Sequence, residues 1–115
     1  MTPASDTPPL EIDCHQLKSR LDAAEDLLLL DCREADEYAL VKIAAAQLLP
    51  MSELMARAAE LEPHRGRPLV VHCHHGGRSL KVTHWMRGQG FVNVKSMAGG
   101  IDQWAMEIDP KLARY

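Results

Sequence analysis

Residues 69–79 read Leu-Val-Val-His-Cys-His-His-Gly-Gly-Arg-Ser. The stretch begins with a short apolar, β-branched run, and a helical pattern follows it. A strand that ends in a glycine-containing turn before a helix aims several N–H groups, and the positive end of the helix dipole, at one point just past the strand. The sequence therefore predicts a cradle for an anion around Cys73.

Cys73 is expected to be a reactive thiolate in this cradle. Inward N–H groups and the cation of Arg78 stabilise the charged form of the thiol, and Gly76 and Gly77 are expected to supply the backbone freedom for a tight loop. A thiol with a pKa of about 8.5 is a few per cent ionised at neutral pH, whereas a pKa about two lower makes it mostly thiolate. The alternative is an inert buried cysteine, but the coincidence of strand, cysteine, glycine pair, arginine and helix start favours an active thiol.

Three motifs resemble those of the rhodanese-like sulfurtransferases. Residues 73–78 (CHHGGR) are similar to that family's active-site loop, whose cysteine carries a persulfide. Residues 28–38 (LLLDCREADEY) resemble its first motif, and residues 90–94 (GFVNV) with 97–104 (MAGGIDQW) its second. The resemblance runs from about Leu10 to Tyr115. The ending, Ile108-Asp109-Pro110 with Arg114-Tyr115, is similar to the rhodanese domains appended to enzymes that adenylylate ubiquitin-like sulfur carriers.

This resemblance implies a two-step sulfur transfer. The Cys73 thiolate attacks the outer sulfur of thiosulfate or a similar donor, sulfite leaves, and the persulfide passes its sulfur to cyanide, a thiol or a protein acceptor. The inward N–H groups of residues 74–79, from His74 to Ser79, are able to stabilise the sulfur charge in the manner of an oxyanion hole. Arg78 is expected to recognise the donor's anionic end, because a surface arginine at a helix N-terminus is otherwise unfavourable.

The neighbours of the loop have two interpretations each. Asp31 and Arg33 either brace the loop or form an internal ion pair at a strand end. Cys32 is expected to pack as a small apolar residue, with the alternative that it lies near Cys73 and resolves the persulfide as a disulfide. The side chains of His74 and His75 either steer anions from the solvent or are simply exposed.

No metal or cofactor is expected at the loop. His72, His74 and His75 suggest a metal site at first sight, but neighbouring residues cannot all face one ion and the usual ligand spacing is absent. A cysteine phosphatase or an arsenate reductase is the main rival enzyme. Such enzymes place five residues between cysteine and arginine to wrap a tetrahedral phosphate, whereas four separate Cys73 from Arg78. The third hypothesis is a persulfide relay or interaction module, with a desulfurase or a sulfur-carrier protein as partner.

Composition excludes several other classes. The net charge is −3, without a basic run, so we expect no nucleic-acid partner. Residues 1–9 are polar and proline-rich and predict a flexible arm before one domain over residues 10–115. We expect no signal peptide and no membrane span, and three cysteines do not make a disulfide framework. These features predict a cytoplasmic protein without membrane association.

The alternation of apolar runs and helical patterns predicts an α/β fold with a mostly parallel sheet of about five strands and helices on both faces. Strands are expected at residues 27–30, 47–49, 69–72 and 92–94. Helices are expected from Asp13, whose capping box Gln16 completes, to about residue 21, at residues 34–39, from a capping Ser52 to about residue 61, at 79–89 and at 101–106. Gly90 is expected in the left-handed position that ends the helix at 79–89, with Phe91 packed back on Met86. The helix after Ser52 should bury Met55, Ala58, Ala59 and Leu61. Residues 41–46 (VKIAAA) depart from the family's usual Gly-His-Ile-Pro-Gly-Ala, so their turn is not predicted.

Overall fold

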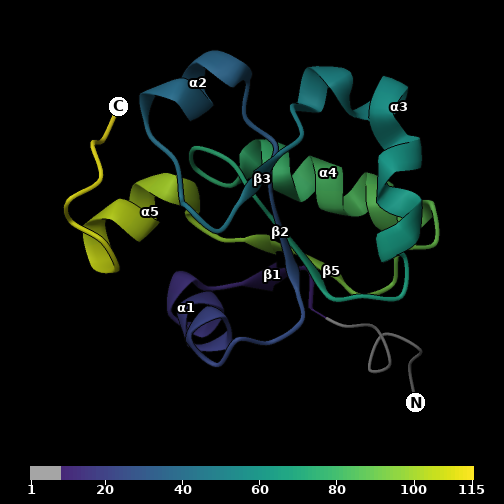
Figure 1. Cartoon of the computed structure of the whole chain (residues 1–115), viewed down its shortest axis with the longest axis horizontal. Coiled ribbons are helices and arrows are strands. Elements are labelled where there is room, and N and C mark those ends of the chain that lie inside the picture. Colours follow the sequence, from purple (N-terminus) through teal and green to yellow (C-terminus); the bar gives the residue numbers. More distant parts are fainter. Residues whose placement is uncertain (1–8) are drawn as a thin grey trace.

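The computed structural model describes residues 9–115 and has a parallel β-sheet at its centre (Figure 1). The sheet contains five strands in the order β1 (Glu11–Ile12), β5 (Val94–Met97), β4 (Leu69–His72), β2 (Leu28–Asp31) and β3 (Gln47–Leu48). All four neighbouring pairs are parallel. The predicted α/β architecture is therefore confirmed.

Helices cover both faces of this sheet. One face packs against α1 (Cys14–Asp22) and α5 (Gly100–Glu107), and the other against α3 (Leu54–Arg57) and α4 (Gly77–Gly88) (Figure 1). The short helix α2 (Ala35–Leu40) lies between β2 and β3 in the chain. Strand β4 is buried at every position because it is central and covered on both sides, which explains why its sequence is a continuous apolar run. Among residues 9–115, no helix has the length and the apolar character to cross a bilayer.

The topology brings the motif residues to one edge of the sheet. Asp31 at the end of β2 is the register partner of His72 at the end of β4, and β5 lies on the other side of β4. Cys73 therefore leaves the central strand at the carboxyl edge, where open α/β sheets place their ligands.

Local signals in the sequence set two helix ends as predicted. The Asp13 carboxylate accepts a hydrogen bond from the N–H of Gln16 (2.7 Å), and the Gln16 side chain accepts one from the N–H of Asp13 (3.2 Å). At the end of α4, Gly90 has a φ of +94°, and the N–H of Phe91 donates to the carbonyl of Met86 (3.1 Å). Both the capping box and the left-handed glycine cap are confirmed.

The helix predicted from Ser52 to residue 61 was wrong in its start and in its buried face. Ser52 lies inside the 3₁₀ turn η2 (Met51–Glu53), and its hydroxyl donates to the Glu34 carboxylate instead of capping a helix. Beyond α3 the chain tightens again into η3 (Ala58–His64). A 3₁₀ turn has three residues per turn, so it shifts the inward positions: Leu54 and Leu61 are buried, whereas Met55 is 72% exposed, Ala59 is exposed and Ala58 is half-buried.

Two strands differ from the prediction. The strand expected at residues 92–94 is β5, and it begins only at Val94, because the cap of α4 occupies Gly90 and Phe91 and leaves Val92 69% exposed. Strand β1 has two residues, too few for an alternation pattern, and was not predicted. The arm predicted for residues 1–9 lies outside the described residues except Pro9, whose carbonyl accepts a hydrogen bond from Arg87 (2.7 Å).

A buried ion pair ties β2 to the following segment. Asp31 and Arg33 are both 0% exposed, and the guanidinium Nη2 lies 2.7 Å from the carboxylate. Arg33 also donates to the carbonyl of Val41 (2.6 Å) and to the hydroxyl of Tyr115 (3.0 Å). The bond from Arg33 holds Val41, the first residue of the segment 41–46. Within this segment, the N–H of Ala46 donates to the carbonyl of Ile43 (2.9 Å) and closes a turn.

The substitution Arg33→Met should destabilise the fold strongly. It leaves the Asp31 carboxylate charged and unpaired in the interior, for which we expect a loss of about 3–5 kcal/mol in the free energy of unfolding. Urea denaturation measures this loss. The double variant Asp31→Leu with Arg33→Met removes both charges and should recover part of it; a loss of less than about 1 kcal/mol in the single variant would contradict the role of the pair.

Candidate active site

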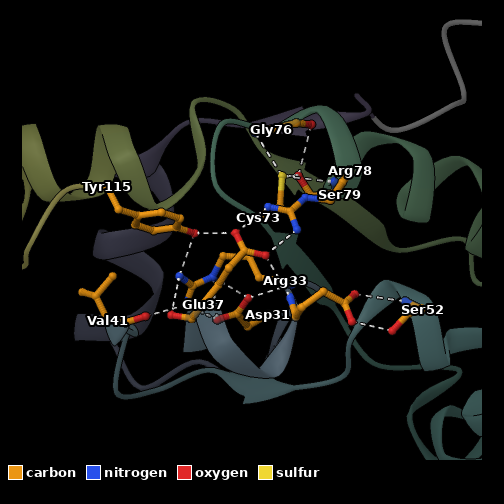
Figure 2. A network of polar contacts seen from close by, with 11 residues as sticks. Asp31, Arg33, Glu37, Val41, Ser52, Cys73, Gly76, Arg78, Ser79 and Tyr115 are labelled. Atoms are coloured by element: carbon orange, nitrogen blue, oxygen red, sulfur yellow. Dashed lines mark hydrogen bonds and ion pairs between the residues drawn. The ribbon is translucent and has the colours of Figure 1, made fainter. Parts of the chain in front are cut away.

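The loop after β4 curls around the sulfur of Cys73. The N–H groups of Gly76 and Ser79 donate to Cys73 Sγ over 3.1 and 3.3 Å, and the Ser79 hydroxyl lies 3.4 Å from the same atom (Figure 2). Ser79 is in the first turn of α4, so the helix N-terminus faces the sulfur. The loop therefore forms the predicted anion cradle, although among residues 74–79 only these two N–H groups bond to the sulfur.

The two loop glycines have different tasks, which the sequence did not separate. Gly76 has a φ of +110°, and a Cβ there would lie 3.3 Å from the N of Gly99. Gly77 is the first residue of α4, has no positive φ, and a Cβ on it would meet nothing within 4 Å. Backbone freedom is therefore needed at Gly76 and not at Gly77, which corrects the expectation for Gly77.

The N-terminus of α5 holds the outer side of the loop. The N–H of Ile101 donates to the carbonyl of Cys73 (2.9 Å), and the N–H of Asp102 donates to the carbonyl of His74 (3.1 Å). A Cβ on Gly100 would stand 2.3 Å from that His74 carbonyl oxygen, so only glycine allows the approach. These bonds turn the loop carbonyls away from the sulfur. In the sequence, residues 99–100 were recognised only as part of the motif 97–104, without a contact to the loop.

Ser79 is itself positioned by β5. Its hydroxyl lies 2.7 Å from the hydroxyl of Ser96 and donates to the carbonyl of Gly76 (3.2 Å), and both serines are 0% exposed. No sequence signal indicates Ser96, because a serine in a strand is ordinary. Only the three-dimensional structure shows that Ser96 is buried next to the loop.

Hydrogen bonds make Cys73 acidic. The thiol of Cys32 is the largest cause, the Ser79 hydroxyl and the N–H groups of Ser79 and Gly76 add to it, and together they outweigh burial and lower the pKa of Cys73 to about 4. The partner thiol responds in the opposite direction: the hydrogen bond to Cys73 and burial raise the pKa of Cys32. Cys73 is therefore the thiolate of the pair at neutral pH.

Arg78 forms a bidentate ion pair with Glu37 across the mouth of the loop. Its guanidinium nitrogens lie 2.6 and 2.8 Å from the two carboxylate oxygens, and these bonds lower the pKa of Glu37 to about 2 (Figure 2). The Tyr115 hydroxyl donates to the same carboxylate (2.7 Å). Sequence reasoning quoted Glu37 and Tyr115 in family motifs but gave neither a role in the site.

The other candidate residues lie around this centre. Asp31 and Arg33 form the internal ion pair described above and reach the mouth of the site through Tyr115. His74 is half-buried and its ring stacks on Tyr115 (3.8 Å between centroids, 6° between planes), unlike the exposed position expected for it. His75 is exposed, as expected, with one ring nitrogen 3.8 Å from the Asp102 carboxylate.

His72 lies at the end of β4 and is buried. It is 0% exposed, burial lowers its pKa, and its Nε2 lies 3.7 Å from the Asp31 carboxylate. The three histidines of the motif are therefore in three different environments.

The comparison with known families agrees with this geometry. Residues 13–107 match the Rhodanese-like domain family. The chain belongs to the rhodanese-like sulfurtransferase family. The motif resemblance that predicted this membership is confirmed.

Individual relatives differ in length. A sulfurtransferase of Allochromatium vinosum is 37% identical to the rhodanese-like chain over 103 residues, which cover 90% of this chain and 94% of that protein. The Zea mays protein adenylyltransferase and sulfurtransferase MOCS3-2 is 32% identical over 109 residues, 90% of this chain but 23% of the maize protein. The crystal structure of a rhodanese-related protein from Thermoplasma volcanium has a TM-score of 0.77 at 29% identity and covers 93% of this chain and 100% of that one.

Replacing each loop glycine by alanine should separate the two tasks. Gly76→Ala forces an L-residue into a left-handed conformation and should lower the free energy of unfolding by about 1–3 kcal/mol. Gly77→Ala, at an unstrained helical position, should leave it unchanged or raise it by up to about 1 kcal/mol. Urea denaturation of the matched pair checks this, and equal losses in both variants would show that the loop glycines are not distinct.

Proposed function

We propose that Cys73 is the nucleophile of a sulfurtransferase that moves a sulfane sulfur from thiosulfate or a similar donor to a thiophilic acceptor. The observation that carries the proposal is the hydrogen-bonded sulfur of Cys73, whose pKa of about 4 keeps it a thiolate at neutral pH. A thiolate is the reactive form of cysteine. The acceptor is cyanide, a thiol or a thiol-bearing protein.

The reaction has two displacements at sulfur. The Cys73 thiolate attacks the outer sulfur of thiosulfate, the sulfur–sulfur bond of the donor breaks, and sulfite leaves with the electron pair. The acceptor then attacks the outer sulfur of the Cys73 persulfide, and the Cys73 thiolate leaves. The same N–H groups that hold the thiolate before the reaction hold it again at the end, without reorganisation.

Burial places a condition on the entry of the donor. Cys73 is 1% exposed, so side chains at the mouth of the loop have to move. The Arg78 side chain is 33% exposed and its guanidinium is occupied by Glu37. The anionic end of thiosulfate offers the same forked guanidinium an equivalent set of oxygen acceptors, and we propose that it replaces Glu37 there.

The rival functions have less support. A phosphatase or arsenate reductase needs the loop arginine for a tetrahedral oxyanion, in a loop one residue longer than the four residues between Cys73 and Arg78. A purely structural interaction module has no need for a thiolate held by hydrogen bonds from Cys32, Ser79 and Gly76.

The physiological partners belong to the proposal as well. Similarity to part of a maize adenylyltransferase and sulfurtransferase supports a role in sulfur transfer within a pathway. For this role we propose a persulfide relay with a desulfurase as donor and a sulfur-carrier protein as acceptor. Three free cysteines, all buried, suit a reducing compartment such as the cytoplasm. The role proposed for the site involves no nucleic acid, membrane or metal.

Incubation with thiosulfate should add one sulfur atom to the protein. The intact mass measured immediately after a brief incubation and removal of excess donor should show this gain, and cyanide should reverse it with formation of thiocyanate. The matched variants Cys73→Ala and Cys14→Ala test the site, because Cys14 is equally buried but on the opposite side of the sheet. The gain should vanish in Cys73→Ala and persist in Cys14→Ala.

Two results would overturn the proposal. One is an unchanged mass in the wild type together with hydrolysis of an aryl phosphate, which would favour the phosphatase. The other is a cyanide-labile gain that survives in Cys73→Ala.

A further inference from the structure

Cys32 and Cys73 leave adjacent parallel strands at the same level. Asp31 of β2 pairs with His72 of β4, and the N–H of Cys32 donates to the His72 carbonyl over 3.0 Å, so the ladder continues to the two cysteines. Neighbouring strands lie about 4.8 Å apart, and a disulfide needs a Cα separation of about 4.4–6.8 Å. The backbone spacing thus suits a bridge between these two residues.

The two side chains also point to the same face of the sheet. Cys32 and Cys73 belong to one buried cluster with Leu30 and Val71, the residues two positions before them, as the alternation of a strand requires. Cys32 is 2% exposed and Cys73 1% exposed. The hydrogen bond between the two side chains is also the largest cause of the lowered pKa of Cys73 and of the raised pKa of Cys32.

We propose that Cys32 is a resolving cysteine that attacks the Cys73 persulfide, forms a Cys32–Cys73 disulfide and releases the carried sulfur as sulfide. This proposal rests on the sulfur transfer proposed above and adds a second outcome to it. When an acceptor is present, the sulfur is transferred. When none is present, the carried sulfur is released as sulfide and the protein remains as the Cys32–Cys73 disulfide.

The step balances without an external oxidant. The Cys32 sulfur forms a bond to Cys73 Sγ, and the bond between Sγ and the outer sulfur breaks. The outer sulfur leaves with the electron pair and takes the Cys32 proton, so that hydrosulfide is the product. The Cys32 sulfur is oxidised as the outer sulfur is reduced, and a dithiol reductant afterwards returns both cysteines to the starting state.

The geometry explains why the disulfide waits for the persulfide. While Cys73 is a thiolate, Cys32 is its hydrogen-bond donor and stays protonated. Once Cys73 carries a second sulfur, the negative charge moves to the outer atom, and Sγ becomes an electrophilic sulfur beside the same thiol. The pair therefore responds to loading of the site.

The variant Cys32→Ser tests this role, because its hydroxyl can still donate the hydrogen bond to Cys73 but cannot form a disulfide. The wild type, Cys32→Ser and the control Cys14→Ser are loaded with thiosulfate, freed of donor and kept without acceptor. Intact mass, sulfite and sulfide are followed over time, and peptide mapping identifies any disulfide. The wild type and Cys14→Ser should release sulfite on loading, lose the added sulfur as one equivalent of sulfide and end two hydrogen atoms lighter than the dithiol.

In Cys32→Ser the added sulfur should persist, with at least a tenfold slower release of sulfide and no disulfide. Equal release by Cys32→Ser and the wild type, or a disulfide that lacks either Cys32 or Cys73, would overturn the resolving role while leaving the transferase intact. If no chain gains sulfur or releases sulfite, the transferase proposal itself fails, and the resolving role fails with it.

Discussion

The negative charge on one sulfur atom depends on hydrogen bonds from several parts of the chain. Cys73 Sγ accepts from the N–H groups of Gly76 and Ser79, and the Cys32 thiol approaches it from the neighbouring strand. A buried anion is costly unless such donors surround it. The cradle also requires the loop to be held open from outside, which the N–H groups of Ile101 and Asp102 do by binding its carbonyls. The site is thus a product of β2, β4, α4 and α5 together.

The charged groups of the site lie on both faces of the sheet. The thiolate lies with Cys32 in the cluster that faces α4, whereas the Asp31–Arg33 ion pair and His72 alternate to the other side. Tyr115 connects the two, since its hydroxyl accepts from Arg33 and donates to Glu37, the partner of Arg78. A neutral His72 at this position avoids a second buried cation beside Arg33, in agreement with its lowered pKa.

Sequence reasoning reached the parts that depend on local signals. The capping box at Asp13, the glycine cap at Gly90 and the buried strand 69–72 follow from residue type and spacing, and the structure has all three. It failed where tertiary contacts decide. Met55 is exposed because 3₁₀ turns changed the period, and β1 is held by pairing with β5 rather than by its own two residues.

The same distinction holds for the site. The loop itself was predictable, because Cys73, Gly76 and Arg78 lie within six consecutive residues. Glu37 lies 41 positions from Arg78, Ser96 lies 17 positions from Ser79, and Tyr115 lies 78 positions from Glu37. No local pattern indicates such pairs. Gly77 shows the converse limit: two adjacent glycines look alike in sequence, but only Gly76 has a positive φ.

The central claim is that the folded chain holds Cys73 as a thiolate, and a pH titration of ultraviolet thiolate absorbance in the wild type and in Cys73→Ser tests it most directly. Burial raises the pKa of Cys14, and the bond to Cys73 raises that of Cys32, so Cys73 should supply the one thiolate per chain at neutral pH.

The pKa of Cys73 in the folded state lies below that of a thiol in the unfolded chain. The thiolate therefore stabilises the fold fully above the ordinary thiol pKa, and this contribution declines as the pH falls toward 4. The account predicts an absorbance step with a midpoint near pH 4 that is missing in Cys73→Ser. An absorbance step from Cys73 that appears only near pH 8.5, roughly the pKa of an ordinary thiol, would contradict it.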